Sequence, residues 1–186
     1  MLHRVFVAIN LPEQVKEKLI SFRKDYEFLP CKWVEKENLH ITVLFLGNLD
    51  DNQLFQTIRT TKQALKNYHS FLVEIDRVCY GPKGKFPPRM LWAEISKNKE
   101  FLKIRDELRG KLFSLPEYQY KTMDFKKGLP HITIARIKSF KFRNLESKPE
   151  IDIPLNIKLE VNSIEVMESE FSKKGSKYTI LESIKL

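Results

Sequence analysis

Apolar and polar residues follow two different periods along the chain, and each period predicts one type of element. Short apolar runs rich in β-branched and aromatic residues predict strands at residues 5–10, 71–80, 90–95, 155–167 and 178–184. Two further strands are predicted where the tripeptide His-Ile-Thr occurs, in LHITVLFLG and in PHITIARIK. Residues 32–34 are expected to form a short extended segment.

Apolar residues at helical spacing predict three helices. The first begins at Pro12 and Glu13, which suit a first helical turn, and the third covers residues 99–113. The second follows Asp50 and Asp51, which can cap it, and ends around residue 68. The connecting segments are a loop at 81–88, an irregular basic segment at 118–127, a polar connection at 143–152 and a turn at 173–176.

The succession of strand, helix and His-Ile-Thr strand occurs twice, which indicates a weak internal duplication. We therefore expect a single α+β domain over residues 1–186. Its architecture should be bilobal, with two pseudo-symmetric modules of mostly antiparallel sheet with helices and the active site in the cleft between them. The lobe halves are expected at about residues 1–80 and 89–153, with closing strands at 154–186 that pair back with the first half.

Each His-Ile-Thr copy places one imidazole beside one hydroxyl. Residues i and i+2 of a strand point to the same face, so His40 joins Thr42 and His131 joins Thr133. We expect the two surfaces to face each other across one phosphate. The other histidines, His3 and His69, have no such setting, and we expect surface or structural roles for them.

Length, cysteine usage and the N-terminus narrow the class of protein. No apolar run among the 186 residues approaches the roughly 20 that a membrane span needs, and the N-terminus lacks a secretory pattern. Cys31 and Cys79 are far apart and outside any zinc-ligand spacing, which favours two free thiols in a reducing compartment. We expect a cytoplasmic protein without a membrane association.

The net charge of +9 is concentrated in two stretches. Residues 121–148 contain eight basic and two acidic residues, and residues 81–90 contain three basic and none acidic. These stretches account for the whole excess. A concentrated positive field favours a polyanionic partner such as RNA, although charge alone also fits a solubilising surface.

Two imidazoles and two hydroxyls suit the cleavage of a phosphodiester. One histidine can accept a proton while the other donates one, because both titrate near neutrality. The threonine hydroxyls can donate to phosphate oxygens, where charge builds in the transition state. Arg136 is a candidate phosphate clamp, although in a regular strand it would face away from Thr133 unless a bulge or the strand end redirects it. Two other interpretations stay open, namely core histidines beside threonines of high β-propensity and a metal site with two histidine ligands.

At these residues the chain resembles the 2H phosphoesterase superfamily, which is named for two His-x-Thr motifs. Within it, the chain is most similar to the RNA 2′,3′-cyclic phosphodiesterases, also known as 2′-5′ RNA ligases. The resemblance covers most of the chain, in RVFVAINLP, WVEKENLHITVLFLG, GKFPPRMLWAEI and LPHITIARI. The family's motifs usually carry Leu after the first Thr. This chain has Val43 and Ile134 in the corresponding places, and both are conservative for a strand.

The resemblance implies hydrolysis of a terminal 2′,3′-cyclic phosphate to a 2′-phosphomonoester without a metal or other cofactor. It also implies that His40 is the proton donor and His131 the proton acceptor, whereas the spacing alone allows either order. Family members can run the reverse reaction and form a 2′-5′ bond. The implied partner is RNA with a 2′,3′-cyclic phosphate end, tRNA fragments included, and we expect a monomer. The alternative is a non-catalytic nucleotide- or RNA-binding module of the same fold.

Aromatic and basic residues are candidates for contacts with the rest of such an RNA. Trp33, Phe45 and Trp92 could stack on a base, although core packing is the favoured interpretation for Phe45 and Trp92 because both lie within strand patterns. The loop from Gly81 to Arg89 and the stretch 121–148 could follow the RNA backbone.

Overall fold

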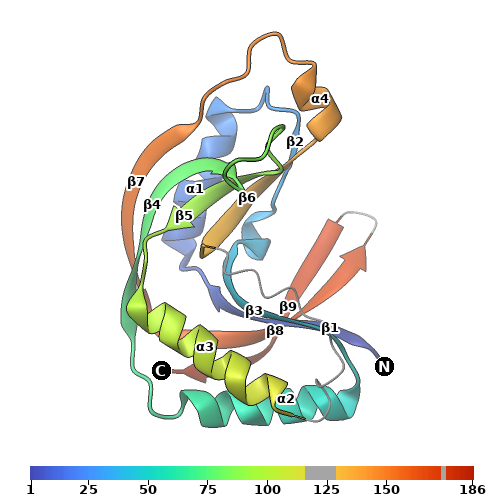
Figure 1. Cartoon of the computed structure of the whole chain (residues 1–186), viewed down its shortest axis with the longest axis vertical. Coiled ribbons are helices and arrows are strands. Elements are labelled where there is room, and N and C mark those ends of the chain that lie inside the picture. Colours follow the sequence, from blue (N-terminus) through green and yellow to red (C-terminus); the bar gives the residue numbers. More distant parts are fainter. Residues whose placement is uncertain (116–128, 173–174) are drawn as a thin grey trace.

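The computed structural model describes residues 1–115, 129–172 and 175–186 of the chain (Figure 1). Its helices are α1 (Glu13–Asp25), α2 (Asp51–Leu65), α3 (Lys99–Phe113) and α4 (Ser139–Arg143), with a 3-10 turn η1 (Lys36–Asn38). Its strands are β1 (His3–Asn10), β2 (Cys31–Trp33), β3 (His40–Leu49), β4 (Phe71–Gly81), β5 (Met90–Ile95), β6 (His131–Ile137), β7 (Asp152–Val161), β8 (Ser163–Ser172) and β9 (Gly175–Lys185).

The strands form one sheet in the order β7-β4-β5-β6-β3-β1-β8-β9, with β2 added beside β6. At its centre, β3 and β6 share a single register pair, Ile41 with Ile132. We call β3-β1-β8-β9 module 1 and β7-β4-β5-β6 with β2 module 2, and Figure 1 shows module 2 above module 1. The described strands pair antiparallel, so the expected α+β fold of mostly antiparallel sheet is confirmed.

The strand pairings divide the chain differently from the boundary expected near residue 80. Strand β4, which we placed in the first half, pairs with β5 and β7 in module 2, and β2 also joins module 2. Each module therefore combines segments from both halves of the chain. The physical reason is that apolar alternation specifies which face of a strand is buried but does not specify its neighbour.

The closing strands also differ from the expectation. Residues 155–167 were expected to form one strand, but they belong to two strands, β7 and β8, which flank Asn162. Strand β7 pairs with β4 in module 2, whereas β8 pairs with β1 in module 1. The sequence pattern did not reveal helix α4, which is only five residues long. The irregular segment at 118–127 and part of the turn at 173–176 lie outside the described residues.

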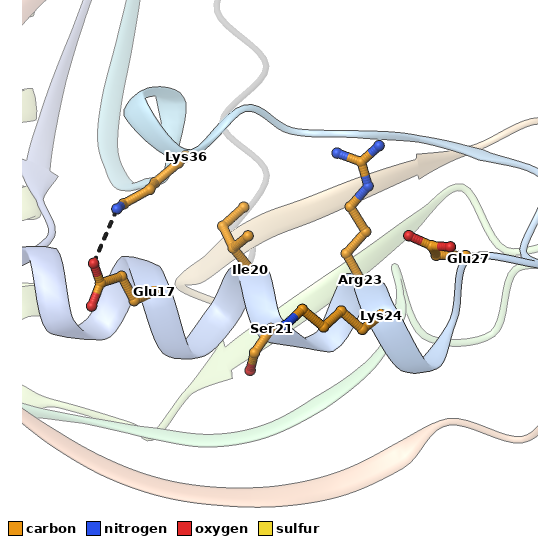
Figure 2. A pocket seen from close by; sticks show the side chains of 7 residues that line it. All are labelled: Glu17, Ile20, Ser21, Arg23, Lys24, Glu27 and Lys36. Atoms are coloured by element: carbon orange, nitrogen blue, oxygen red, sulfur yellow. Dashed lines mark hydrogen bonds and ion pairs between the residues drawn. The ribbon is translucent and has the colours of Figure 1, made fainter.

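Helices cover the apolar face of the sheet. Helices α2 and α3 pack against each other and against β3, and α2 also contacts β1 and β9. Helix α1 runs along the strands of module 2 in Figures 1 and 2, and its buried residues include Val15 and Leu19. One continuous core joins these helices to alternate residues of the strands, such as Val5, Val7 and Ile9 of β1. The other face of β1 carries Phe6, Ala8 and a smaller apolar cluster. In the three described stretches of the chain, no helix is long and apolar enough to cross a membrane.

Helix α2 begins with a capping box that offers a direct test of its local stability. The Asp50 side chain accepts a hydrogen bond of 2.9 Å from the Gln53 backbone N–H, and the Gln53 side chain accepts one of 3.0 Å from the Asp50 backbone N–H. We predict that Asp50→Ala lowers the free energy of unfolding by about 1 kcal/mol, as measured by urea denaturation. Asp50→Asn should lower the free energy of unfolding by only a few tenths of a kcal/mol, because Asn is an equally good N-cap. Equal losses in both variants would contradict this role of the cap.

Candidate active site

The two His-Ile-Thr segments are neighbours at the junction of the modules. Ile41 and Ile132 face each other across the β3–β6 pair, and both are fully buried on the core side. The two histidines and two threonines flank this pair, are half-buried, and therefore point to the opposite face of the sheet. The antiparallel register sets His40 on the Thr133 side of the pair and Thr42 on the His131 side. The motif residues thus share one face of adjacent strands.

Both imidazoles are held by the same local hydrogen bond. The Nδ1 atom of His40 lies 2.7 Å from the carbonyl oxygen of Asn38, and that of His131 lies 2.9 Å from the carbonyl oxygen of Leu129. In each case the partner is the residue two positions earlier. A carbonyl oxygen can only accept, so Nδ1 carries the proton in both neutral rings and Nε2 is left for chemistry. The Nε2 of His40 lies 2.9 Å from the Thr42 hydroxyl oxygen.

The site lowers the pKa of both histidines below the ordinary value of 6.5. Burial is the largest cause in each case, because it disfavours the charged imidazolium. The positive charges of His131, Lys16 and Arg136 also lower the pKa of His40, and that of Arg136 lowers the pKa of His131. The carbonyl hydrogen bonds act in the opposite direction. Both rings are therefore mainly neutral at pH 7 in the free protein.

A β-bulge turns Arg136 toward the histidine face. The β5–β6 register shifts between Trp92–Thr133 and Leu91–Ala135, so β6 contains one extra residue there. Alternation then resumes with Ala135 buried and Arg136 exposed. This is the redirection that the sequence left open, and it agrees with the effect of the Arg136 charge on the pKa of both histidines. Thr133 also lies on this face, where its hydroxyl is 3.9 Å from the Met90 sulfur.

Trp92 is a structural support for His131. Its indole stacks on the imidazole, with ring centroids 3.8 Å apart and planes inclined by 19°. Trp92 is only 9% exposed, but it pairs with Thr133 and therefore packs on the histidine face, outside the main core cluster. On the other side of β5, Gly81 leaves room for the indole, since a Cβ atom built there would lie 2.1 Å from the Trp92 Cδ2 atom. The sequence pattern did not reveal this requirement for glycine.

A group of aromatic rings surrounds His40. The Phe6 ring lies 5.0 Å from the imidazole, and the Tyr178 ring meets the imidazole edge-on at 5.2 Å. Phe45 lies beside Phe6 at 6.1 Å and is 66% exposed, so the core-packing interpretation was wrong for Phe45. The cause is a bulge in the β1–β3 register between Ala8–Thr42 and Val7–Leu44, where β3 has one extra residue, so that Phe45 pairs with Phe6 on the histidine face. Trp33 is half-buried and packs against the core.

Asn38 links the C-terminal hairpin to His40 through three hydrogen bonds. Its carbonyl oxygen accepts from the His40 imidazole, and its side-chain amide donates to the Ser176 carbonyl oxygen at 2.7 Å. Its side-chain oxygen accepts from the Tyr178 backbone N–H at 3.2 Å. Sequence reasoning missed this residue, because its partners are about 140 residues away in the chain. Its place two residues before His40 was the one available signal.

Glu94 is a second residue that the sequence pattern did not single out. It is buried and lies opposite His131 in the β5–β6 register, and its negative charge raises the pKa of His131. Lys83 neutralises it through an ion pair of 3.0 Å. Cys79 lies 3.7 Å from the carboxylate, and burial and the charge of Glu94 raise the pKa of its thiol to about 11. The Cys79 thiol is therefore a poor nucleophile at neutral pH.

Other candidate sites lie apart from this arrangement. Within residues 1–115, 129–172 and 175–186, no three His, Cys, Asp or Glu side chains form a group that could hold a metal ion. A pocket lies on the exposed side of α1, and most of the side chains that line it are charged (Figure 2). Among them, Lys36 and Glu17 form an ion pair of 3.3 Å. Its lining residues are Glu17, Ile20, Ser21, Arg23, Lys24, Glu27 and Lys36.

Known proteins resemble this chain in sequence and in fold. The family described as LigT-like phosphoesterase matches residues 9–92. A protein of Methanocaldococcus jannaschii is 33% identical over 143 residues, which cover 73% of this chain and 72% of the relative. A protein of Thermotoga maritima is 27% identical over 96% of this chain and 92% of its own length. Both relatives are named RNA 2′,3′-cyclic phosphodiesterase.

A solved structure of a protein from Thermus thermophilus superposes with a TM-score of 0.85 at 26% identity and covers 98% of this chain and 97% of its own. The fold and the paired His-Ile-Thr strands define the class of protein as an enzyme, a phosphoesterase of the 2H type. Together with the relatives, they show that the chain belongs to the LigT-like phosphoesterase family.

The packing of Trp92 against Gly81 and His131 leads to a prediction about Gly81→Ala. The added methyl group overlaps the indole, so we expect Trp92 to shift and the free energy of unfolding to fall by about 1–3 kcal/mol. The pKa of His131, followed by NMR titration, should rise toward 6.5 as the ring loses burial. Gly110→Ala is the matched control, because nothing lies within 4 Å of a Cβ at that helical position. An unchanged pKa of His131 in destabilised Gly81→Ala would contradict the support role of Trp92.

Proposed function

We propose that this protein is a metal-independent RNA 2′,3′-cyclic phosphodiesterase that opens a terminal 2′,3′-cyclic phosphate to a 2′-phosphomonoester. The observation that carries the proposal is the equivalent setting of the two histidines. Each ring is fixed by a carbonyl oxygen two residues earlier, and both flank one antiparallel residue pair on the same face. The names of relatives at 27% and 33% identity support the same substrate class.

The reaction needs one proton acceptor and one proton donor. In the proposed mechanism, the neutral Nε2 atom of His131 takes a proton from a water molecule, whose oxygen attacks the phosphorus. The protonated Nε2 atom of His40 gives its proton to the 3′ oxygen as the bond from phosphorus to that oxygen breaks. The product has a 2′-phosphate and a 3′-hydroxyl. The assignment of donor and acceptor follows the family resemblance, since the two histidines have matching local geometry.

Three further side chains are proposed to bind the phosphate. The hydroxyls of Thr42 and Thr133 lie on the histidine face and can donate to the non-bridging oxygens. Thr42 now contacts His40, so it would transfer its hydrogen bond to the phosphate when substrate binds. The guanidinium of Arg136 supplies a fixed positive charge, which is most favourable when negative charge accumulates in the transition state.

The surroundings of the site suggest how the rest of the substrate is bound. The exposed ring of Phe45 is a platform on which the terminal base can stack.

Formation of a 2′-5′ RNA bond from a cyclic phosphate and a 5′-hydroxyl is the reverse chemistry at the same two histidines. We propose RNA with a cyclic phosphate end, tRNA fragments included, as the partner, in the cytoplasm and with the protein acting as a monomer.

We predict that His40→Ala and His131→Ala each abolish the opening of 2′,3′-cyclic AMP, because either variant lacks one of the two proton-transfer groups. Turnover is measured by chromatography, and the position of the product phosphate on the 2′ or 3′ oxygen by NMR. His69→Ala is the control, because His69 is exposed and should leave turnover unchanged.

Turnover close to that of the wild type in either active-site variant would remove the two-histidine mechanism. A wild-type protein that binds the nucleotide without opening it would instead support the non-catalytic binding module.

The lowered pKa values lead to a prediction about pH. The active form carries one proton on the pair, so kcat/KM should show a bell-shaped pH dependence. Both free-enzyme pKa values lie below 6.5, and the maximum should therefore lie on the acid side of pH 6.5. The activity should persist in excess EDTA. A maximum above pH 7, or loss of activity on chelation with recovery on metal addition, would contradict the proposed chemistry.

A further inference from the structure

Exposed aromatic and basic side chains gather at the end of module 2. The loop between β4 and β5 carries Phe86, which is 69% exposed, and helix α4 carries Phe140, which is 78% exposed. Basic residues adjoin both rings in the sequence and are exposed. We define this group as the β6-end surface, which consists of Lys85, Phe86, Arg89, Lys138, Phe140 and Lys141.

The two segments are held together by specific contacts, although about 50 residues separate them in the chain. The Phe86 ring lies 6.5 Å from the buried ring of Phe142 in α4. The Arg89 carbonyl oxygen accepts a hydrogen bond of 2.9 Å from the Ile137 backbone N–H, at the end of β6. Figure 1 shows the loop and α4 at the same end of module 2. The six residues therefore belong to one surface.

The charge of this surface has few local counterions. Residues 82–89 and 136–145 contain no acidic residue, and the described ion pairs of the loop involve only Lys83, which is bound to Glu94. Contact of the Phe86 and Phe140 rings with water is unfavourable, and neither ring is needed to fill the core. Cations interleaved with exposed aromatic rings are the combination that binds single-stranded nucleic acid, because the bases stack while the phosphates pair with the cations.

Strand β6 connects this surface to the histidines. His131 begins the strand, Arg136 lies on the histidine face beyond the bulge, and Lys138 follows directly after the strand ends. At about 3.3 Å per residue, β6 extends roughly 20 Å from His131 to its last residue, Ile137. This distance is longer than a single nucleotide. Lys32 lies beside Arg136 in the β2–β6 register and adds to the basic character of this path.

We propose that the β6-end surface binds the single-stranded body of an RNA substrate, namely the nucleotides on the 5′ side of the one that carries the cyclic phosphate. This inference rests on the proposed function, because it places the reacting end between the two histidines. RNA leaves that site along β6, its phosphates contact Lys138 and the other cations of the surface, and bases further along stack on Phe140 and Phe86. The surface would contribute to the affinity for long substrates without taking part in the bond-breaking step.

The test compares a short and a long substrate in a variant that removes both kinds of interaction. The variant carries Phe86→Ala, Phe140→Ala, Arg89→Gln and Lys141→Gln, and the full-length protein is used. The long probe is a fluorescein-labelled single-stranded RNA of about ten nucleotides that ends in a 2′,3′-cyclic phosphate. We expect its Kd and KM to rise about fivefold or more for each aromatic ring removed. The slope of log Kd against log salt should become shallower by about 0.7 for each phosphate that the variant no longer neutralises.

The short probe, 2′,3′-cyclic AMP, should be turned over with an unchanged kcat/KM, which also shows that the variant is folded. The matched control carries Phe55→Ala, Arg59→Gln and Lys66→Gln, which are exposed residues on and just after α2 in module 1, and should bind the long RNA like the wild type. Equal loss in the control and the variant, or an unchanged Kd in the variant, would overturn the inference. If the wild type opens neither probe, the proposed function fails, and anisotropy binding of the long RNA still tests the surface. A preference for duplex RNA over the single strand would also overturn it.

Discussion

The pairing of Ile41 with Ile132 is the constraint on which the site depends. This one register pair joins two modules that otherwise share few strand contacts, and both isoleucines are fully buried. Because side chains alternate along a strand, burying the two isoleucines on the core side commits the flanking histidines and threonines to the other face. A shift of one residue in either strand would bury two of the polar side chains. The same apolar contact that closes the sheet therefore brings the chemical groups together.

The two histidines share one local geometry but have different supports. His40 is surrounded by Phe6 and Tyr178 of module 1 and is tied to the C-terminal hairpin through Asn38. His131 is stacked on Trp92 of module 2, with Glu94 nearby. Burial lowers the pKa of both rings, whereas Glu94 raises the pKa of His131 alone. The duplicated motif thus supplies equal groups, and the modules around it give the two imidazoles unequal environments.

Much of the fold and of the site could be predicted from the sequence. The helices, most strands and the face shared by each His-x-Thr pair follow from periods of 3.6 and 2 residues, which are local properties of the chain. Phe45 shows the limit of this reasoning. Its strand pattern predicted a core position, but a bulge between Thr42 and Leu44 of β3 turned it toward solvent on the histidine face. Bulges depend on the partner strand, so the pattern of one segment does not encode them.

Local rules applied to the sequence identify the groups that are available: two imidazoles, two hydroxyls and two basic stretches. How these groups are combined depends on the tertiary structure. It assigned β4 and β7 to module 2, turned Arg136 toward the histidines, placed the Trp92 ring between Gly81 and His131, and linked Asn38 to residues about 140 positions away. The physical reason is that alternation and helical spacing fix the direction of a side chain relative to its own element. Its neighbours and its pKa depend on which distant strands pair, and that choice is made by the packing of the whole chain.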